Sequence, residues 1–246
     1  KSLEKIKINM RVIHNVSKPD TSIELFGRKM SSPIFAAPVS GTILNMGGKV
    51  SEKEYIEPVV RGCSNSGIYA MVGDTNVDTF LLDNLDVLKD NRGNGIVFIK
   101  PWNNSKIIDK IRLSEEAGAF AVGVDLDACG LINNQFQENP FSPKTIDEIR
   151  ELVESTRLPF IIKGIMTVDD ALMAVEYGAS AIIVSNHGGR VLDYTPGTCE
   201  VLPDIAKSVK GKITILVDGG VRTGVDVVKM LGLGADAVLM GRPFVT

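Results

Sequence analysis

The segment VSNHGGRVLDYTPGT, residues 184–198, sets one of only two histidines in the chain beside two glycines and an arginine. No helix or strand periodicity in this segment would bury His187 in a core. Because imidazole changes its charge near neutral pH, a histidine held on such a turn can exchange a proton with a small molecule. The segment therefore predicts proton-transfer chemistry at His187.

A lysine interrupts the apolar run PFIIKGI, residues 159–165. A buried ammonium group costs free energy unless an anion meets it. Lys163 therefore either extends its charge out of the mouth of the protein, as long basic side chains can, or faces a bound group. A cofactor that becomes anionic during turnover would supply the missing partner.

Two glycine-containing segments near the end of the sequence, DGGVRTG (218–224) and MGRPF (240–244), share the same features. Each follows an apolar run and combines glycine with arginine, and the first also opens a helix. Backbone N–H groups at a helix start and guanidinium groups together bind phosphate. A simple tight turn is the alternative interpretation of Gly219 and Gly220, but the repeated pattern favours a phosphate site.

The elements that position these residues alternate along the chain. Eight apolar runs of strand length lie at residues 33–40, 68–74, 95–101, 120–127, 159–165, 181–186, 213–220 and 237–242. Helical spacing separates them, most clearly in TVDDALMAVEYGA (167–179), where Thr167 can cap the helix, and also at 51–67, 104–119, 142–157 and 222–235. The pattern predicts an α/β fold, a (β/α)8 TIM barrel with its chemistry at the C-terminal ends of the strands.

A doubly wound open sheet is the competing fold. It is disfavoured because the first strand lacks a GxGxxG turn and polar residues follow many strands instead of one switch point. One domain is expected over residues 1–246, with residues 1–32 as an N-terminal extension in which SIELFGRKM (22–30) forms a hairpin over one mouth. The sequence stops where an eighth helix is expected, so either it is a fragment or another element closes the barrel.

Composition limits the function classes. A formal charge of -3 argues against a general nucleic-acid or membrane-surface binder, and no apolar run is long enough to span a bilayer. The three cysteines have no CxxC spacing, which predicts neither a disulfide framework nor a zinc site and favours a reducing cytoplasm. No set of histidine, cysteine and carboxylate residues has the spacing of metal ligands, so no metal is expected.

Residues 161–205 and 215–244 closely resemble the FMN-dependent 2-hydroxy-acid oxidising enzymes, the group of glycolate oxidase and lactate oxidase. The similarity is carried by SNHGGR together with DGGVRTGVDV, a highly specific combination, and is dense from residue 159 to 244. Upstream, PIFAAPVSG and EAGAFAVGVDLD fit less tightly. The resemblance implies FMN as the cofactor and a homo-oligomer, a tetramer, as the assembly.

The resemblance also implies residue roles. His187 falls on the base that takes the substrate proton, Asp127 on the aspartate that orients it, and Lys163 on the lysine beside flavin N1, where reduction builds negative charge. Arg190 falls on the arginine that pairs with the substrate carboxylate, a role suited to a bidentate donor. The other FMN contacts fall on Ala37, Pro38, Val39, Lys100, Asp125, Ser185, Asp218, Gly219, Gly220, Arg222, Gly241 and Arg242.

The sequence departs from the family at the substrate side. Trp102 replaces the tyrosine that hydrogen-bonds the substrate, so it is expected to bind the substrate in its place, although an indole N–H can donate only one bond. Residues 128–143 lack the second carboxylate-binding arginine and form a shorter loop than usual. Lys100 replaces a flavin-contacting glutamine. This lysine either offers a new cation to a larger or doubly anionic substrate, or pairs with Asp125.

The predicted function is FMN-dependent oxidation of a small L-2-hydroxy acid, similar to lactate or glycolate, to the 2-oxo acid. Oxygen or another acceptor would then take the electrons. Proton removal from the hydroxyl group and proton removal from carbon would both use His187. The alternatives are another FMN-barrel chemistry, such as that of type 2 isopentenyl-diphosphate isomerase, and a noncatalytic flavin-binding protein.

Overall fold

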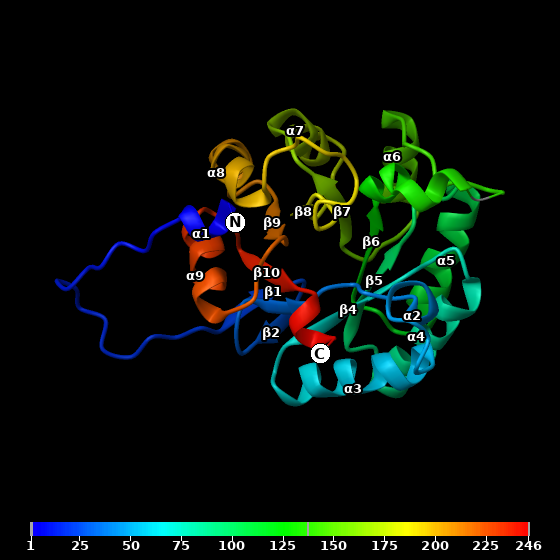
Figure 1. The fold of residues 1–246 in the computed structure, drawn as a ribbon, viewed down its shortest axis with the longest axis horizontal. Coiled ribbons are helices and arrows are strands. Elements are labelled where there is room, and N and C mark those ends of the chain that lie inside the picture. The colour runs from blue at the N-terminus through cyan, green and yellow to red at the C-terminus, as the bar shows by residue number, and fades with distance from the viewer. Residues whose placement is uncertain (1, 137, 246) are drawn as a thin grey trace.

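A closed parallel barrel of eight strands forms the core of the protein (Figure 1). The computed structural model describes residues 2–136 and 138–245. The strands follow one another around the barrel as β3 (Ile34–Ala36), β4 (Tyr69–Gly73), β5 (Gly95–Ile99), β6 (Ala121–Asp125), β7 (Phe160–Ile165), β8 (Ala181–Val184), β9 (Thr214–Val217) and β10 (Ala237–Met240). Closure of β10 onto β3 confirms the predicted TIM barrel and excludes the doubly wound open sheet.

The strands are buried on both faces, which explains their continuous apolar runs. Every residue of β5, β6, β8 and β10 is buried. Every strand except β7 also ends before the apolar run that predicted it does. The run at 33–40, for example, yields only Ile34–Ala36, because its last residues leave the sheet and form a loop at the C-terminal mouth.

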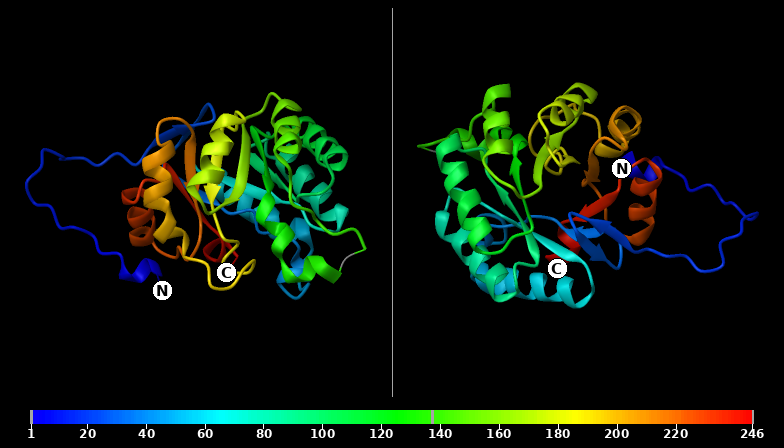
Figure 2. Two further views of the ribbon diagram at one scale, coloured as in Figure 1. Left: turned by 90° about the horizontal axis from the view of Figure 1, so that it is seen from above. Right: turned by 180° about the vertical axis from the view of Figure 1, so that it is seen from behind.

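Helices pack around the outside of the barrel (Figure 2). They are α2 (Thr42–Asn45), α3 (Glu52–Asn65), α4 (Asp78–Asp90), α5 (Asn104–Glu116), α6 (Ile146–Glu154), α7 (Val168–Glu176), α8 (Thr198–Val209) and α9 (Gly224–Gly232). The five predicted helices are present, and the Thr167 hydroxyl accepts from the backbone N–H of Asp170 as predicted. The helices α4 and α8 were not predicted, because neither begins with a side-chain cap that marks its start.

The N-terminal extension contains a short helix, α1 (Ser2–Lys5), and the predicted hairpin, β1 (Ile23–Leu25) and β2 (Arg28–Met30). Phe26 and Gly27 both have positive φ, as a two-residue hairpin turn requires. The Arg28 guanidinium lies 5.4 Å from the ring centroid of Phe120, which directly precedes β6. The hairpin therefore lies at the N-terminal end of the barrel strands, opposite the predicted site.

The chain from β10 onward makes a 3-10 turn, η3 (Arg242–Phe244), among the last described residues. In the described part of the chain, none of the helices has the length and apolar character needed to cross a bilayer.

Candidate active site

The candidate site is built at the C-terminal ends of neighbouring strands. Asp125 is the last residue of β6, Lys163 pairs with it in register on β7, and His187 and Asp218 follow β8 and β9. Because the barrel strands are parallel, all of these residues reach the same mouth. The structure brings the predicted base, His187, together with Asp125, Asp127 and Lys163.

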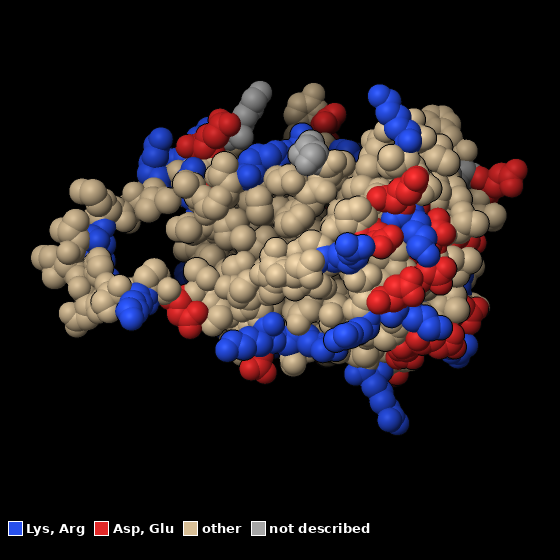
Figure 3. Space-filling view, turned by 90° about the horizontal axis from the view of Figure 1, so that it is seen from below, with Lys and Arg blue, Asp and Glu red and all other residues tan. Residues whose placement is uncertain are grey.

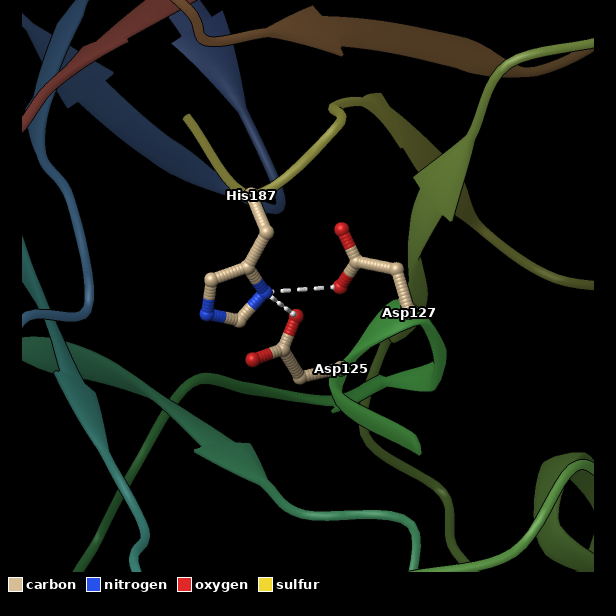
Figure 4. A group of neighbouring side chains, drawn as sticks. All are labelled: Asp125, Asp127 and His187. Atoms are coloured by element: carbon tan, nitrogen blue, oxygen red, sulfur yellow. Dashed lines mark hydrogen bonds and ion pairs between the residues drawn. The ribbon is translucent and has the colours of Figure 1, made fainter. Parts of the chain in front are cut away.

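His187 is held between two carboxylates (Figure 4). Its Nδ1 lies 3.0 Å from Oδ1 of Asp127 and 3.5 Å from Oδ1 of Asp125. Both neighbours are acceptors, so we assign the ring proton to Nδ1, which leaves Nε2 as the basic nitrogen. Figure 4 shows Nε2 on the side of the ring away from both carboxylates. The imidazole is therefore oriented to take a proton from a molecule in the mouth.

The turn that carries His187 depends on a left-handed backbone. His187 has φ 55°, and Gly188 and Gly189 continue in the same region with φ 71° and 78°. For a residue other than glycine this conformation is uncommon and costs free energy. The backbone N–H of His187 donates to the buried Ser185 hydroxyl at 3.2 Å, which helps to fix it. Sequence reasoning placed Ser185 at the flavin; here it also supports the histidine backbone.

Gly164 lets Asp127 approach the imidazole, a role that sequence reasoning missed. The residue lies at a register shift in β7 and has φ 107°. A Cβ atom at this position would lie 2.7 Å from Cβ of Asp127 and 2.9 Å from its backbone nitrogen. The available signal was a glycine inside the apolar run IIKGI, which is typical of a bulge or a close backbone approach.

Asp125 is the centre of a buried ion-pair network. Its Oδ1 accepts from Nζ of Lys163 at 2.7 Å, and its Oδ2 accepts from Nζ of Lys100 at 2.5 Å. Burial alone would raise the pKa of Asp125, but the two ammonium groups outweigh it and hold this pKa well below its usual value. Asp125 therefore stays ionised.

This network decides between the alternatives that the sequence left open for Lys163 and Lys100. Lys163 is only 4% exposed, so it does not extend out of the mouth. Burial lowers its pKa, but Asp125, Asp127 and Asp218 more than compensate and raise it. Lys100 pairs with Asp125, one of the two alternatives; its ammonium group is already engaged, which argues against a role as a new cation for a doubly anionic substrate.

Asp127 differs from Asp125 in its charge environment. Its burial raises its pKa and the neighbouring Asp125 charge adds to this, although Lys163 at 3.5 Å and His187 act in the opposite direction. Its Oδ2 is buried and has no hydrogen-bond partner among the described residues. Asp127 therefore has one oxygen on the imidazole and a second oxygen that no described residue contacts by a hydrogen bond.

Asp125, Asp127 and His187 lie close enough together that their ligand atoms could in principle surround a metal ion. Ligand atoms of Asp125, Asp127 and His187 lie within 4.8 Å of one another. However, both Asp125 oxygens accept hydrogen bonds from lysine ammonium groups, and these positive charges repel a metal ion. The cluster serves to hold the imidazole and the lysines.

Trp102 does not face a substrate with its N–H group, which corrects the sequence-based expectation. Its indole Nε1 donates to Oδ2 of Asp74 at 2.8 Å, and the side chain is buried. Asp74 also accepts from Nζ of Lys110 at 2.8 Å and from the Lys100 backbone. Because an indole has one donor, none remains for a substrate oxygen. Asp74 ends the apolar run at residues 68–74, and no local motif in the sequence indicates this role.

The β6–α6 connection packs against this tryptophan. It contains two 3-10 turns, η1 (Leu126–Gly130) and η2 (Ile132–Phe136), and the buried Asn134 side chain bonds to the backbone of Cys129 and Phe141. The Phe141 ring then meets the Trp102 ring edge-on at 4.6 Å. A short loop is thus ordered by one asparagine and closes one side of the mouth.

The expected cofactor residues of the first and last strands lie side by side. The backbone N–H of Ala37 donates to Met240, and a Cβ on Gly241 would lie 3.6 Å from the Val39 side chain. Ala37, Pro38, Val39 and Gly241 are all partly exposed at the mouth. They form a backbone-lined rim suited to a flat ring.

The segment after β9 presents an unsatisfied carboxylate. Asp218 Oδ1 is buried without a hydrogen-bond partner among the described residues, while the Asp218 carbonyl accepts from the Thr198 hydroxyl at 2.6 Å. Gly219 has φ 104°, and a Cβ there would lie 2.6 Å from the Thr198 oxygen. Gly220 also has positive φ and is exposed.

The arginines lie on exposed turns at the mouth. The Nε of Arg190 donates to the His187 carbonyl at 3.1 Å, so this guanidinium is tied to the turn of the base. Arg222 and Arg242 are exposed beside Gly220 and Gly241. At the start of α9, the Asp226 carboxylate already accepts the backbone N–H groups of Arg222 and Thr223. The helix start therefore offers fewer free amides to a phosphate than the sequence pattern suggested.

Comparison with known proteins identifies what this chain is similar to. The model of the family described as FMN-dependent dehydrogenase matches residues 1–142 and 129–246. A 2-hydroxyacid oxidase of Dictyostelium discoideum is 32% identical over 285 residues, covering 99% of this chain and 69% of the relative. An L-lactate oxidase of Lysinibacillus sphaericus is 31% identical, covering 99% of this chain and 72% of the relative.

Solved structures agree with these relatives. A mandelate oxidase variant with a monooxide FMN adduct has a TM-score of 0.77 and 29% sequence identity, covering 98% of this chain and 74% of that chain. The two parts of the family match overlap at residues 129–142, within the β6–α6 connection.

Proposed function

Because this chain belongs to the FMN-dependent dehydrogenase family, whose cofactor is FMN, we propose that it oxidises a small L-2-hydroxy acid, similar to lactate or glycolate, to the 2-oxo acid. Oxidation of 2-hydroxy acids is the activity of its relatives, whose names divide among 2-hydroxyacid, L-lactate and mandelate oxidases. The observation that carries the proposal is the His187 imidazole, held by Asp127 with Nε2 toward the mouth.

The residues at the mouth fit FMN. The unsatisfied Asp218 oxygen suits a ribityl hydroxyl donor, and the positive-φ glycines 219 and 220, with Arg222, Gly241 and Arg242, suit the phosphate. The rim of Ala37, Pro38 and Val39 suits the face of the isoalloxazine ring. Lys100, Asp125, Lys163 and Ser185 would complete the contacts to its polar edge.

Bound FMN would supply the two-electron acceptor for the reaction. Nε2 of His187 takes one proton from the substrate, from either its hydroxyl group or its carbon. Asp127 stabilises the resulting imidazolium through Nδ1, and Asp125 adds a second negative charge at 3.5 Å. Lys163 keeps a positive charge at the site where negative charge builds during reduction.

Substrate binding is assigned to Arg190. Its guanidinium lies on the same turn as the base, so a carboxylate bound there places the adjacent carbon near the imidazole. A small substrate is favoured because Trp102 and Phe141 fill the β5 and β6 side of the mouth. In place of the tyrosine hydroxyl expected there, the protein has an indole committed to Asp74.

The remaining partners are part of the same proposal. Electrons pass from the reduced cofactor to oxygen or another acceptor, and the chain self-associates as the family resemblance implies. Cys63, Cys129 and Cys199 are all free thiols, which supports a reducing cytoplasm as the location.

An anaerobic mixing experiment tests the function. The purified FMN-loaded chain is mixed separately with glycolate, L-lactate, L-mandelate and, as a control, D-lactate, and the flavin absorbance and the 2-oxo acid are followed. We expect rapid loss of the flavin band with glycolate or L-lactate, slower loss with L-mandelate and none with D-lactate. Bound FMN that no hydroxy acid reduces would favour a noncatalytic protein, and conversion of isopentenyl diphosphate by the reduced protein would favour the isomerase chemistry.

A further inference from the structure

A glutamate lies on the inner face of helix α3, where an apolar residue is expected. The buried positions of this helix are Glu52, Ile56, Val60 and Cys63, which follow the spacing of one helical stripe. Figure 3 looks at the molecule from the side on which α3 lies in Figure 1, and basic and acidic side chains are both exposed on that surface. Glu52 is not part of this surface, since it is only 1% exposed. An acidic side chain buried in this way requires polar partners.

The Glu52 carboxylate binds the loop that follows β3. Its oxygens accept from the Ser40 hydroxyl, from the backbone N–H of Gly41 at 3.0 and 3.1 Å, and from the backbone N–H of Thr42 at 2.9 Å. Its hydrogen-bond partners in the described part of the chain are all uncharged. Hydrogen bonds to an ionised group are about twice as strong as those between neutral groups. Glu52 therefore ties this loop firmly to α3.

An asparagine on the next helix completes the same cluster. Its Nδ2 donates to the Ser40 hydroxyl at 3.1 Å and to the carbonyl of Gly73, the last residue of β4, at 2.8 Å. Gly73 in turn lies against the loop, because a Cβ at this position would be 2.9 Å from the carbonyl oxygen of Pro38. The cluster is called here the rim anchor and consists of Ser40, Gly41, Thr42, Glu52 and Asn84.

The rim anchor fixes one end of the rim formed by residues 37–39. These residues lie directly before Ser40 in the chain, and Ser40 is bonded to Glu52. At the other end of the rim, the backbone N–H of Ala37 donates to the carbonyl of Met240 at 2.9 Å. The rim therefore spans three residues between two fixed points, and removal of either point would free its backbone.

We propose that Glu52 is a positioning residue for the cofactor. The inference rests on the proposed function, in which the isoalloxazine ring lies against the rim. Because Glu52 is buried beneath the loop, it acts through Ser40 and Gly41, whose bonds to it set the backbone of the rim before FMN arrives. A surface that needs no ordering on binding gives a higher affinity. The buried charge of Glu52 thus contributes to FMN affinity and not to proton transfer.

Release of FMN from the loaded protein tests the proposal. The loaded chain is diluted stepwise below its thermal midpoint, and the fluorescence of released FMN gives the dissociation constant. Glu52→Gln replaces an acceptor oxygen with a donor and should raise this constant at least about tenfold. Glu54→Gln is the matched control on the same helix, because the exposed Glu54 accepts from the Ser51 backbone N–H at 2.8 Å. The control should lower the thermal midpoint and leave FMN affinity unchanged.

A second pair of variants decides the question if Glu52→Gln does not fold. Ser40→Ala removes a hydroxyl that donates to Glu52, so it should raise the dissociation constant for FMN by a smaller factor. Thr42→Val is its control, because the buried Thr42 hydroxyl has no hydrogen-bond partner among the described residues. This control should bind FMN as wild type does.

The visible circular dichroism of the bound flavin separates positioning from a general loss of stability. At saturating FMN, Glu52→Gln and Ser40→Ala should each change this spectrum, because the ring meets a displaced rim, whereas both controls should keep the wild-type spectrum. Wild-type FMN affinity in Glu52→Gln and Ser40→Ala, or a wild-type spectrum in both, would overturn the inference. A wild-type chain that binds FMN but is reduced by no hydroxy acid would instead contradict the proposed function alone.

Discussion

The two sides of the barrel mouth hold their functional groups by different means. On the side formed by the ends of β4 to β7, called the paired side, charged groups satisfy one another: Asp125 holds Lys100 and Lys163, and Asp74 holds Trp102. On the side formed by the ends of β8 to β10, called the turn side, the backbone sets positions. There His187 and the glycines that follow it are left-handed.

Because of this difference, the paired side fixes the charges of the site, whereas the turn side is available to bind a ligand. Groups on the paired side have their partners before any ligand arrives, so their substitution should cost folding stability. The turn side keeps atoms for a ligand, as the unsatisfied Asp218 oxygen shows, so substitution there should cost affinity or rate. Asp127 belongs to both sides, because one of its oxygens contacts His187 and the other has no hydrogen-bond partner in the described part of the chain.

The largest effect on the paired side is expected for Asp125→Asn. The substitution leaves the buried Lys100 and Lys163 ammonium groups without their carboxylate, and removing one partner of a buried pair costs about 3–5 kcal/mol. Urea unfolding measures the loss. Asp236→Asn is the matched control, because its partner Lys210 is half exposed and such a pair contributes about 0–1 kcal/mol.

The pH dependence of stability sharpens the same prediction. The pKa of Asp125 is lower in the folded state than its usual value of 3.8. Its contribution to stability is therefore complete above that value and disappears as the pH falls through the lowered folded pKa. The stability difference between wild type and Asp125→Asn should shrink in acid; a constant difference down to pH 2 would contradict the ion-pair account.

Asp127→Asn should separate rate from stability. Loss of the carboxylate that supports the imidazolium should slow flavin reduction by about 10²-fold. Burial raises the pKa of Asp127 above its usual value of 3.8. Ionising this group therefore costs folding free energy as the pH rises from 3.8 through the raised pKa of the folded state. The variant should therefore be as stable as wild type at pH 4 and as stable or more stable at pH 7, which thermal unfolding at both pH values measures.

Arg190→Lys tests the turn side. A single ammonium group replaces a bidentate guanidinium, so the dissociation constant for the hydroxy acid should rise about tenfold, or about 1.4 kcal/mol. The rate of flavin reduction at saturating substrate and the thermal midpoint should change little. Arg222→Lys is the control, since it should weaken FMN binding and leave the substrate constant unchanged in the loaded enzyme. An unchanged substrate constant in Arg190→Lys would remove the arginine from the substrate site.

Trp102→Phe should give the smallest effect. It removes one hydrogen bond to Asp74, which still accepts from Lys110 and from the Lys100 backbone, so stability should fall by about 1 kcal/mol. The dissociation constant for substrate should not change. A tenfold higher dissociation constant for substrate with unchanged stability would show that the indole N–H binds substrate. The assignment of Trp102 to the paired side would then be wrong.

The same contrast explains what could be predicted from the sequence. Each turn of the turn side is specified by residues that are neighbours in the sequence. SNHGGR and DGGVRTG contain the glycines that their conformation needs, so these turns could be predicted from the sequence. The eight strands could also be predicted from the sequence, because buried parallel strands are continuously apolar. Their ends were less accurate, because apolar residues such as Val39 continue past the sheet into the loop.

The paired side depends on contacts between distant residues. Asp74 meets Trp102 across 28 positions and Lys163 meets Asp125 across 38, and no local pattern specifies such pairs. The Trp102 N–H was therefore assigned to substrate although Asp74 holds it. The role of Gly164 was missed for the same reason, since it is defined by the Asp127 backbone that lies against it.

The central claim is that His187 Nε2 takes the substrate proton. The most direct test is anaerobic stopped-flow reduction of FMN-loaded His187→Gln, with His14→Gln, a substitution of the other, exposed histidine, as the control. The His187 variant should bind FMN normally but be reduced by L-lactate or glycolate at least about 10²-fold more slowly than wild type, while the His14 variant behaves as wild type. Reduction of the His187 variant at the wild-type rate would contradict the account.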